Sequence, residues 1–155
     1  MRVIIDGDSF PAKKEAIEAA AAGKAGVIVV TSMAHAPSEK YAGAELVLVE
    51  NENQAADIRI MNLAQKGDIV LTNDTGLSLV AVSKGAVVID AYGRTRNGRE
   101  LETRMEIVHI EKKALRQKKG KRKIRGLSAY TALDASRLKD AVLNALKNGG
   151  KGGAD

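Results

Sequence analysis

Short runs of β-branched residues, each followed by a segment with helical spacing, constrain the fold of this chain more than any other feature. The first run, Val-Ile-Ile, ends abruptly at Asp6, where polar residues begin. Further runs of the same kind lie at residues 27–31, 45–49, 68–72 and 86–90. Strands that alternate with helices predict a parallel sheet with helices on both faces. We therefore expect a three-layer α/β/α fold around a central, mostly parallel five-stranded sheet.

The segments between these runs predict the helices. Ser9 is a candidate cap for a first helix, which has Pro11 near its first turn and ends at Gly23. Further helices are expected at about residues 54–66, 77–80, 99–116 and 135–147. The last of these is amphipathic, because its apolar residues fall on one face at helical spacing.

The length of 155 residues fits a single domain. We interpret residues 1–147 as this domain, and residues 148–155, which are rich in glycine, as a disordered tail. The domain divides into a core, a variable basic segment and a C-terminal helix, at residues 1–93, 94–130 and 131–147. Aromatic residues make up only 3% of the chain, so its core must consist of Val, Ile, Leu and Ala, as in buried parallel sheets.

The chain has no cysteine, which excludes a disulfide framework and any thiolate metal site and suits a reducing cytosol. It has no run of about 18 apolar residues, and Met1 and Arg2 lead directly into the first strand-like run. We therefore expect a cytoplasmic protein that neither spans a membrane nor carries a secretion signal.

Positive charge is concentrated in one part of the chain. The net charge is +6, but residues 112–125 hold nine basic residues and no acidic one. The remaining 16 basic and 19 acidic residues give about −3. A basic segment of this kind can bind a polyanion, because each neutralised phosphate releases counterions. Lys121 and Arg122 are its candidate substrate-binding residues. A solvated charge run without a partner is the alternative, and it stays open.

Aspartates follow the expected strands. Asp6 and Asp8 come directly after the first run, and Asp74 follows the fourth. Side chains at i and i+2 of an extended backbone point to the same side, and two carboxylates so placed repel unless a cation neutralises them. Asp74 reaches the same edge if strands one and four are neighbours. Asp57, expected in the first turn of a helix, can supply a fourth carboxylate. Hard oxygen ligands of this type suit Mg²⁺ or Mn²⁺.

Each of these aspartates also has a structural interpretation. Asp6 and Asp8 are equally consistent with a solvated turn that caps the next helix. Asp57 taken alone is better explained as compensation of the helix dipole. Asp90, which ends the fifth run, is typical of a turn-forming residue, and we leave it out of the candidate site.

Four pieces of the sequence follow one another with a fixed order and spacing over about residues 1–93. Residues 6–11 fit the pattern Asp-x-Asp-x-x-Pro, 31–35 are like Asn-Ser-x-x-His, 55–57 are Ala-Ala-Asp, and 67–74 fit Gly-Asp-x-Val-x-Thr-x-Asp. Together they resemble the YaiI/YqxD family of uncharacterised bacterial proteins, which is placed among the PIN-like nuclease folds. Two departures matter: Phe10 stands where family members usually have cysteine, and residues 94–130 follow the family poorly.

The resemblance implies a PIN-like fold in which an acidic pocket holds one or two Mg²⁺ or Mn²⁺ ions. The implied catalytic and metal-binding residues are Asp6, Asp8, Asp57 and Asp74. The implied activity is that of a metal-dependent nuclease, a hydrolase of phosphodiester bonds, with RNA preferred to DNA. Ser32 and His35 are candidate substrate-binding residues beside this pocket.

Two other functions stay open. Residues 4–9 also match the Asp-x-Asp-x-Ser/Thr opening of haloacid-dehalogenase-like phosphatases, in which Asp6 would be the nucleophile and Asp8 the acid/base. No cap segment is visible, and the match to the YaiI/YqxD family extends over more of the chain. The third function is a non-catalytic RNA-binding module of PIN-like fold. Assembly as a homodimer is also left open by the sequence.

Overall fold

The computed structural model describes residues 1–117 and 129–149, and its centre is a mostly parallel sheet. The strands lie in the order β3-β2-β1-β4-β5-β6, and all neighbours pair in parallel except β5 and β6. Their bounds are β1 Arg2–Asp6, β2 Gly26–Ser32, β3 Glu45–Val49, β4 Ile69–Leu71, β5 Val87–Ile89 and β6 Thr95–Arg96. The predicted α/β class is confirmed.

In the described part of the chain the sheet has six strands rather than the expected five. The additional strand, β6, is only two residues long and pairs antiparallel with β5. From the sequence this region is predicted to be a polar turn, because two residues are too few for a hydrophobic pattern. A turn is indeed present before β6, and Asp90 N donates to Arg94 O across it (3.0 Å).

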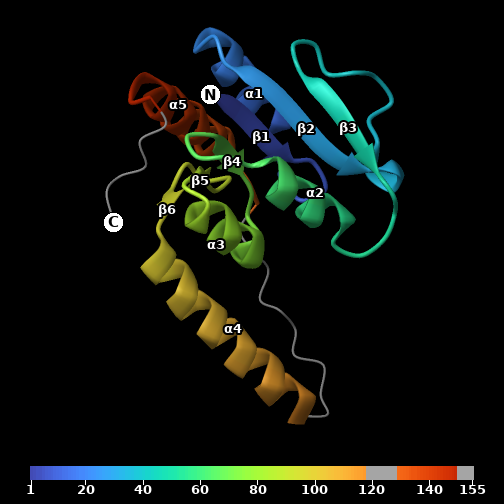
Figure 1. Ribbon diagram of the computed structural model, residues 1–155, viewed down its shortest axis with the longest axis vertical. Coiled ribbons are helices and arrows are strands. Elements are labelled where there is room, and N and C mark those ends of the chain that lie inside the picture. The colour runs from blue at the N-terminus through green and yellow to red at the C-terminus, as the bar shows by residue number, and fades with distance from the viewer. Residues whose placement is uncertain (118–128, 150–155) are drawn as a thin grey trace.

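Helices cover both faces of the sheet, which confirms the three-layer arrangement (Figure 1). Their bounds are α1 Lys13–Ala22, α2 Ala55–Leu63, α3 Thr75–Ser83, α4 Gly98–Gln117 and α5 Ala132–Lys147. Successive side chains of β1 alternate between the layers. Val3 and Ile5 pack with residues of α1 and α5, whereas Ile4 packs with residues of α2 and α3. The core is therefore two apolar clusters separated by the sheet.

The ends of two helices differ from the prediction. Ser9 does not cap α1, which begins at Lys13 without a side-chain cap, because the Ser9 hydroxyl donates to Asp6 Oδ2 instead (2.7 Å). Helix α5 begins earlier than expected. Thr131 and Asp134 form a capping box there, and each side chain accepts a hydrogen bond from the other residue's backbone N–H.

Helix α4 extends away from the rest of the molecule and contacts α3 near its beginning (Figure 1). Leu101 anchors this end and is almost fully buried. Lys121, Arg122 and most of the basic segment lie outside the described residues, as do residues 150–155 of the expected tail, so these predictions stay untested. Within the described ranges, no helix is long and apolar enough to cross a membrane.

Candidate active site

The aspartates that end β1 and follow β4 lie at the same edge of the sheet, because these two strands are neighbours. This was the condition on which the sequence prediction depended. Asp6 is buried, and its Oδ2 accepts hydrogen bonds from Thr72 Oγ1 (2.8 Å) and Ser9 Oγ (2.7 Å). The Thr72 hydroxyl in turn accepts from Asp74 N (3.1 Å). A hydrogen-bonded chain therefore joins Asp6 to the backbone of Asp74.

Gly7 brings Asp8 against the end of β2. A Cβ atom at this position would lie 2.8 Å from both Val30 O and the Cβ of Thr31, so only glycine allows the loop to pass so close. Asp8 Oδ1 then accepts from Thr31 Oγ1 (2.8 Å), Ser32 N (2.8 Å) and Ser32 Oγ (3.1 Å). These contacts fix the orientation of the carboxylate.

The electrostatic surroundings of Asp8 favour its charged form. Partial burial opposes ionisation, but hydrogen bonds from Ser32 and Thr31 and the nearby His35 outweigh it and hold the pKa of Asp8 below its ordinary value. His35 Nδ1 lies 3.5 Å from Asp8 Oδ1 and 2.9 Å from Ser32 Oγ. Ser32 and His35 thus contact Asp8 directly, and their contact with substrate stays a prediction.

All four predicted aspartates, Asp6, Asp8, Asp57 and Asp74, line one open pocket of about 360 Å³. We call it the acidic pocket. Asp57 lies in the first turn of α2, as predicted, and is half-buried. Burial and then the negative charges of Asp74, Asp6 and Asp8 raise the pKa of Asp57 to about 6. The four carboxylates therefore act on one another electrostatically, although they come from separate parts of the chain.

Sequence reasoning missed a fifth carboxylate in the acidic pocket. Glu52 also lines it, from the turn that precedes α2. Acidic residues are common in turns at protein surfaces, so the local sequence does not distinguish Glu52 from an ordinary surface residue. Its place in the pocket follows from the path of the chain between β3 and α2.

The carboxylate oxygens in this pocket are ligands of the type that a hard divalent cation prefers. Asp6, Asp8 and Asp74 each use one carboxylate oxygen for hydrogen bonds within the protein, and Asp74 Oδ1 accepts from Leu77 N (2.7 Å) to cap α3. The other oxygen of each accepts no hydrogen bond from the described residues. Within those residues, no three Asp, Glu or His side chains lie close enough together to hold an ion as they stand. The chemistry of the donor set fits Mg²⁺ or Mn²⁺, but its present spacing is wider than that of a coordination sphere.

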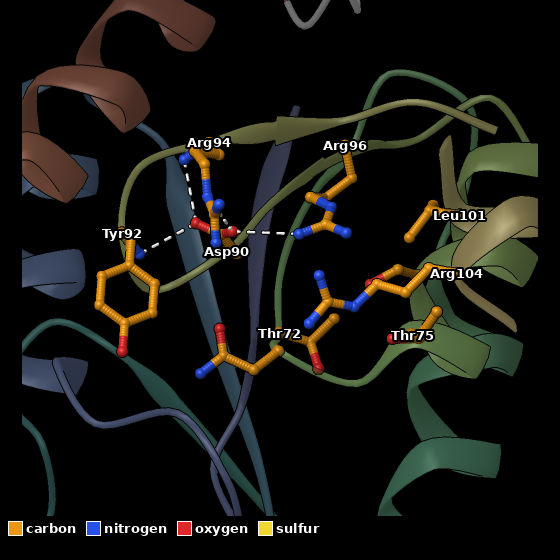
Figure 2. A pocket seen from close by; sticks show the side chains of 10 residues that line it. Thr72, Thr75, Asp90, Tyr92, Arg94, Arg96, Leu101 and Arg104 are labelled. Carbon is orange, nitrogen blue, oxygen red and sulfur yellow. Dashed lines mark hydrogen bonds and ion pairs between the residues drawn. The ribbon is translucent and has the colours of Figure 1, made fainter. Parts of the chain in front are cut away.

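A second pocket, of about 220 Å³, lies beside the first and shares Asn73 with it. Figure 2 shows this second pocket from close by. We call it the arginine pocket, because Arg94, Arg96 and Arg104 line it. Asp90 also lines it and is buried, with its carboxylate paired to Arg94 Nε (2.9 Å) and Arg96 Nη1 (3.3 Å).

The interpretation of Asp90 as a turn former is correct but incomplete. Its Oδ1 accepts from the backbone of Tyr92 (2.9 Å) and Arg94 (3.0 Å), which closes the turn before β6. Its other oxygen holds the two arginines. In the sequence, the two arginines at positions 94 and 96 are a signal for this pocket. The signal can be interpreted only once β6 is known to pair with β5.

The fold and site together define an α/β protein with adjacent acidic and basic pockets at the carboxyl edge of a mostly parallel sheet. Its sequence matches the family described as "Uncharacterized BCR, YaiI/YqxD family" over residues 4–148. The chain therefore belongs to the YaiI/YqxD family, and the resemblance seen in the sequence is confirmed. The match also includes residues 94–130, where the sequence analysis found little likeness.

Bacterial relatives support the same conclusion. The chain is 34% identical to a UPF0178 protein of Bacillus anthracis over 140 residues, which are 90% of this chain and 94% of the relative. UPF0178 proteins of Bacillus cereus and Bacillus thuringiensis subsp. konkukian are 33% and 32% identical over the same shares. No solved structure matches the chain.

Proposed function

We propose that this protein is a metal-dependent nuclease of PIN-like type, which hydrolyses phosphodiester bonds at the acidic pocket and prefers RNA to DNA. The observation that supports this most is the convergence of Asp6, Asp8, Asp57 and Asp74 in one pocket. There, burial and then the charges of the other three carboxylates raise the pKa of Asp57 to about 6. Neighbouring negative charges that raise a pKa in this way favour binding of a cation, and perturbed carboxylates in a pocket are typical of functional sites.

Asp6, Asp8, Asp57 and Asp74 would hold the ion, and Ser9, Thr72, Thr31 and Ser32 keep two of these carboxylates in place. A Mg²⁺ or Mn²⁺ ion bound there supplies polarisation of the phosphoryl oxygen and a lower pKa for bound water. The hydrogen bonds to Asp6 and Asp8 reduce the reorganisation that ligand binding would otherwise require.

The phosphatase alternative has less support. No lysine lines the acidic pocket among the described residues, although lysine would be expected to neutralise a phosphoenzyme in such an enzyme. A non-catalytic RNA-binding module uses the same pocket residues as the nuclease, so only an activity measurement separates the two.

The test is cleavage of a labelled single-stranded RNA with Mn²⁺ or Mg²⁺, with EDTA as the metal-free control. We expect Asp6→Asn and Asp74→Asn to lower the cleavage rate by about 100-fold or more, because each removes a charge that positions the ion. Asn remains a good helix cap, so Asp74→Asn should keep α3 intact. Asp140→Asn is the matched control, because Asp140 is exposed on α5 and lines neither pocket.

Three outcomes contradict the proposal. Cleavage that continues unchanged in EDTA would exclude a metal requirement. Absence of cleavage of every RNA and DNA oligonucleotide tested, with RNA binding retained, would favour the non-catalytic module. Trapping of a covalent phosphoenzyme at Asp6 would favour the phosphatase.

A further inference from the structure

The arginine pocket contains hydrogen-bond donors that find no acceptor in the described part of the protein. The side chain of Arg96 is only 8% exposed, and its buried Nε has no hydrogen-bond partner there. A buried donor without a partner costs about 1–3 kcal/mol. Such groups are rare in native proteins and call for an explanation. An acceptor from a bound molecule would provide one.

Positive charge exceeds negative charge in the arginine pocket. Arg94 and Arg96 share one buried carboxylate, that of Asp90, and Arg96 also pairs with Glu100 at 3.2 Å. Arg104 forms no ion pair with the described residues. Figure 2 shows Arg96 and Arg104, which come from β6 and α4, with their guanidinium groups pointing toward one another. Two like charges in this arrangement repel, and an anion between them would remove the repulsion.

The neutral residues of the pocket also offer donors. Asn73 Oδ1 accepts a hydrogen bond from Ala91 N (2.9 Å), which fixes the orientation of the amide and leaves its Nδ2 as a donor. Thr75 adds a hydroxyl from the first turn of α3. Asn73 lines both pockets, so a molecule in the arginine pocket lies next to one in the acidic pocket.

We propose that the arginine pocket binds a phosphate group of a single-stranded RNA whose neighbouring phosphodiester lies in the acidic pocket. The planar fork of arginine matches phosphate oxygens, and contacts of this type position a strand without reading its sequence. The identity of the ligand as RNA rests on the proposed nuclease function. The binding of phosphate by these arginines does not require cleavage, so the two proposals can fail separately.

The experiment measures binding of a fluorescein-labelled single-stranded RNA by fluorescence anisotropy in EDTA, with the full chain. Arg104→Gln is the informative variant, because Arg104 is exposed and forms no described ion pair, so the fold should tolerate its loss. Arg99→Gln is the matched control. It removes the same charge from the same helix, at a residue that is exposed and does not line the pocket.

We expect Arg104→Gln to weaken RNA binding about 10-fold and to lower the slope of log K against log salt by about 0.7, the value for one phosphate contact on a single strand. Arg99→Gln should change the affinity by less than about two-fold. Equal affinities of the two variants would overturn the proposal, even if the wild type cleaves RNA. Weaker binding by Arg104→Gln alone would support it, even if no variant cleaves RNA.

A second arm separates an RNA phosphate from free phosphate. Inorganic phosphate should raise the Tm of the wild type more than that of Arg104→Gln, because a ligand that binds only the folded state stabilises it. It should also compete with the labelled RNA. Stabilisation by phosphate without any effect of Arg104→Gln on RNA binding would overturn the assignment to RNA.

Discussion

The acidic pocket and the arginine pocket lie side by side, yet an aspartate has opposite electrostatic surroundings in each. In the acidic pocket, burial and the neighbouring carboxylates both raise the pKa of Asp57, to about 6. In the arginine pocket, Asp90 is more deeply buried but is paired with Arg94 and Arg96. The comparison shows that burial alone does not determine the energy of a carboxylate. The charges around it add to the cost of burial in the acidic pocket and offset it in the arginine pocket.

The largest effect on stability is expected from removing the charge of Asp90. Asp90→Asn should lower the free energy of unfolding by about 3 kcal/mol, because it removes the buried carboxylate that Arg94 and the buried Arg96 share. For a chain of this length the Tm should fall by about 10 °C. Urea and thermal unfolding, with Asp140→Asn as the control, provide the measurement. A loss no larger than that of the control would mean that Asp90 is not the partner that stabilises these arginines.

The same substitution in the acidic pocket should have the opposite sign. Because the pKa of about 6 lies above the ordinary value of 3.8, ionisation of Asp57 destabilises the fold increasingly as the pH rises between these values. Asp57→Asn removes this penalty. In EDTA at pH 8, Asp57→Asn should therefore raise the free energy of unfolding by about 1 kcal/mol. This value is lower than the pKa shift alone implies, because Asp57 is half-exposed and solvent screens its charge.

Two further measurements test this prediction, one at a lower pH and one with an added cation. At pH 4 the wild type and Asp57→Asn should be nearly equal in stability, because Asp57 is then protonated in the fold. Adding Mn²⁺ at pH 8 should raise the Tm of the wild type and raise that of the variant less. A variant that is less stable than the wild type at pH 8 in EDTA would show that the carboxylates are not in mutual repulsion.

The smallest effect on function is expected from a substitution far from both pockets. Thr131→Ala removes half of the capping box of α5 and should lower the free energy of unfolding by about 1 kcal/mol. Because α5 packs on α1 and lines neither pocket, RNA cleavage and RNA binding should stay unchanged below the Tm. Ser136→Ala, at an exposed position of the same helix, is the control for stability. A change in cleavage rate with Thr131→Ala would show that global stability, rather than the pockets, governs the activity.

Much of the acidic pocket was predictable because its aspartates follow recognisable elements. Asp6 ends one apolar run and Asp74 lies shortly after another, these runs form neighbouring strands, and Asp57 lies in the first turn of a helix. Parallel strands place their carboxyl ends at one edge, so the convergence of these residues follows from topology. The start of α1 was not predictable in this way, since Ser9 had two possible partners and bonds Asp6 rather than the helix.

Local sequence patterns were enough to predict the alternation of strands and helices, the two-sided burial of β1 and the aspartates at the strand ends, because these features depend on periods of two and 3.6 residues. The arginine pocket, in contrast, depends on contacts between parts of the chain that are distant in sequence. Arg96 belongs to a strand of two residues that exists through its pairing with β5, and Arg104 comes from a helix farther along the chain. The Nε of Arg96 has no hydrogen-bond partner among the described residues, and this feature and the raised pKa of Asp57 likewise depend on burial and on neighbours distant in sequence.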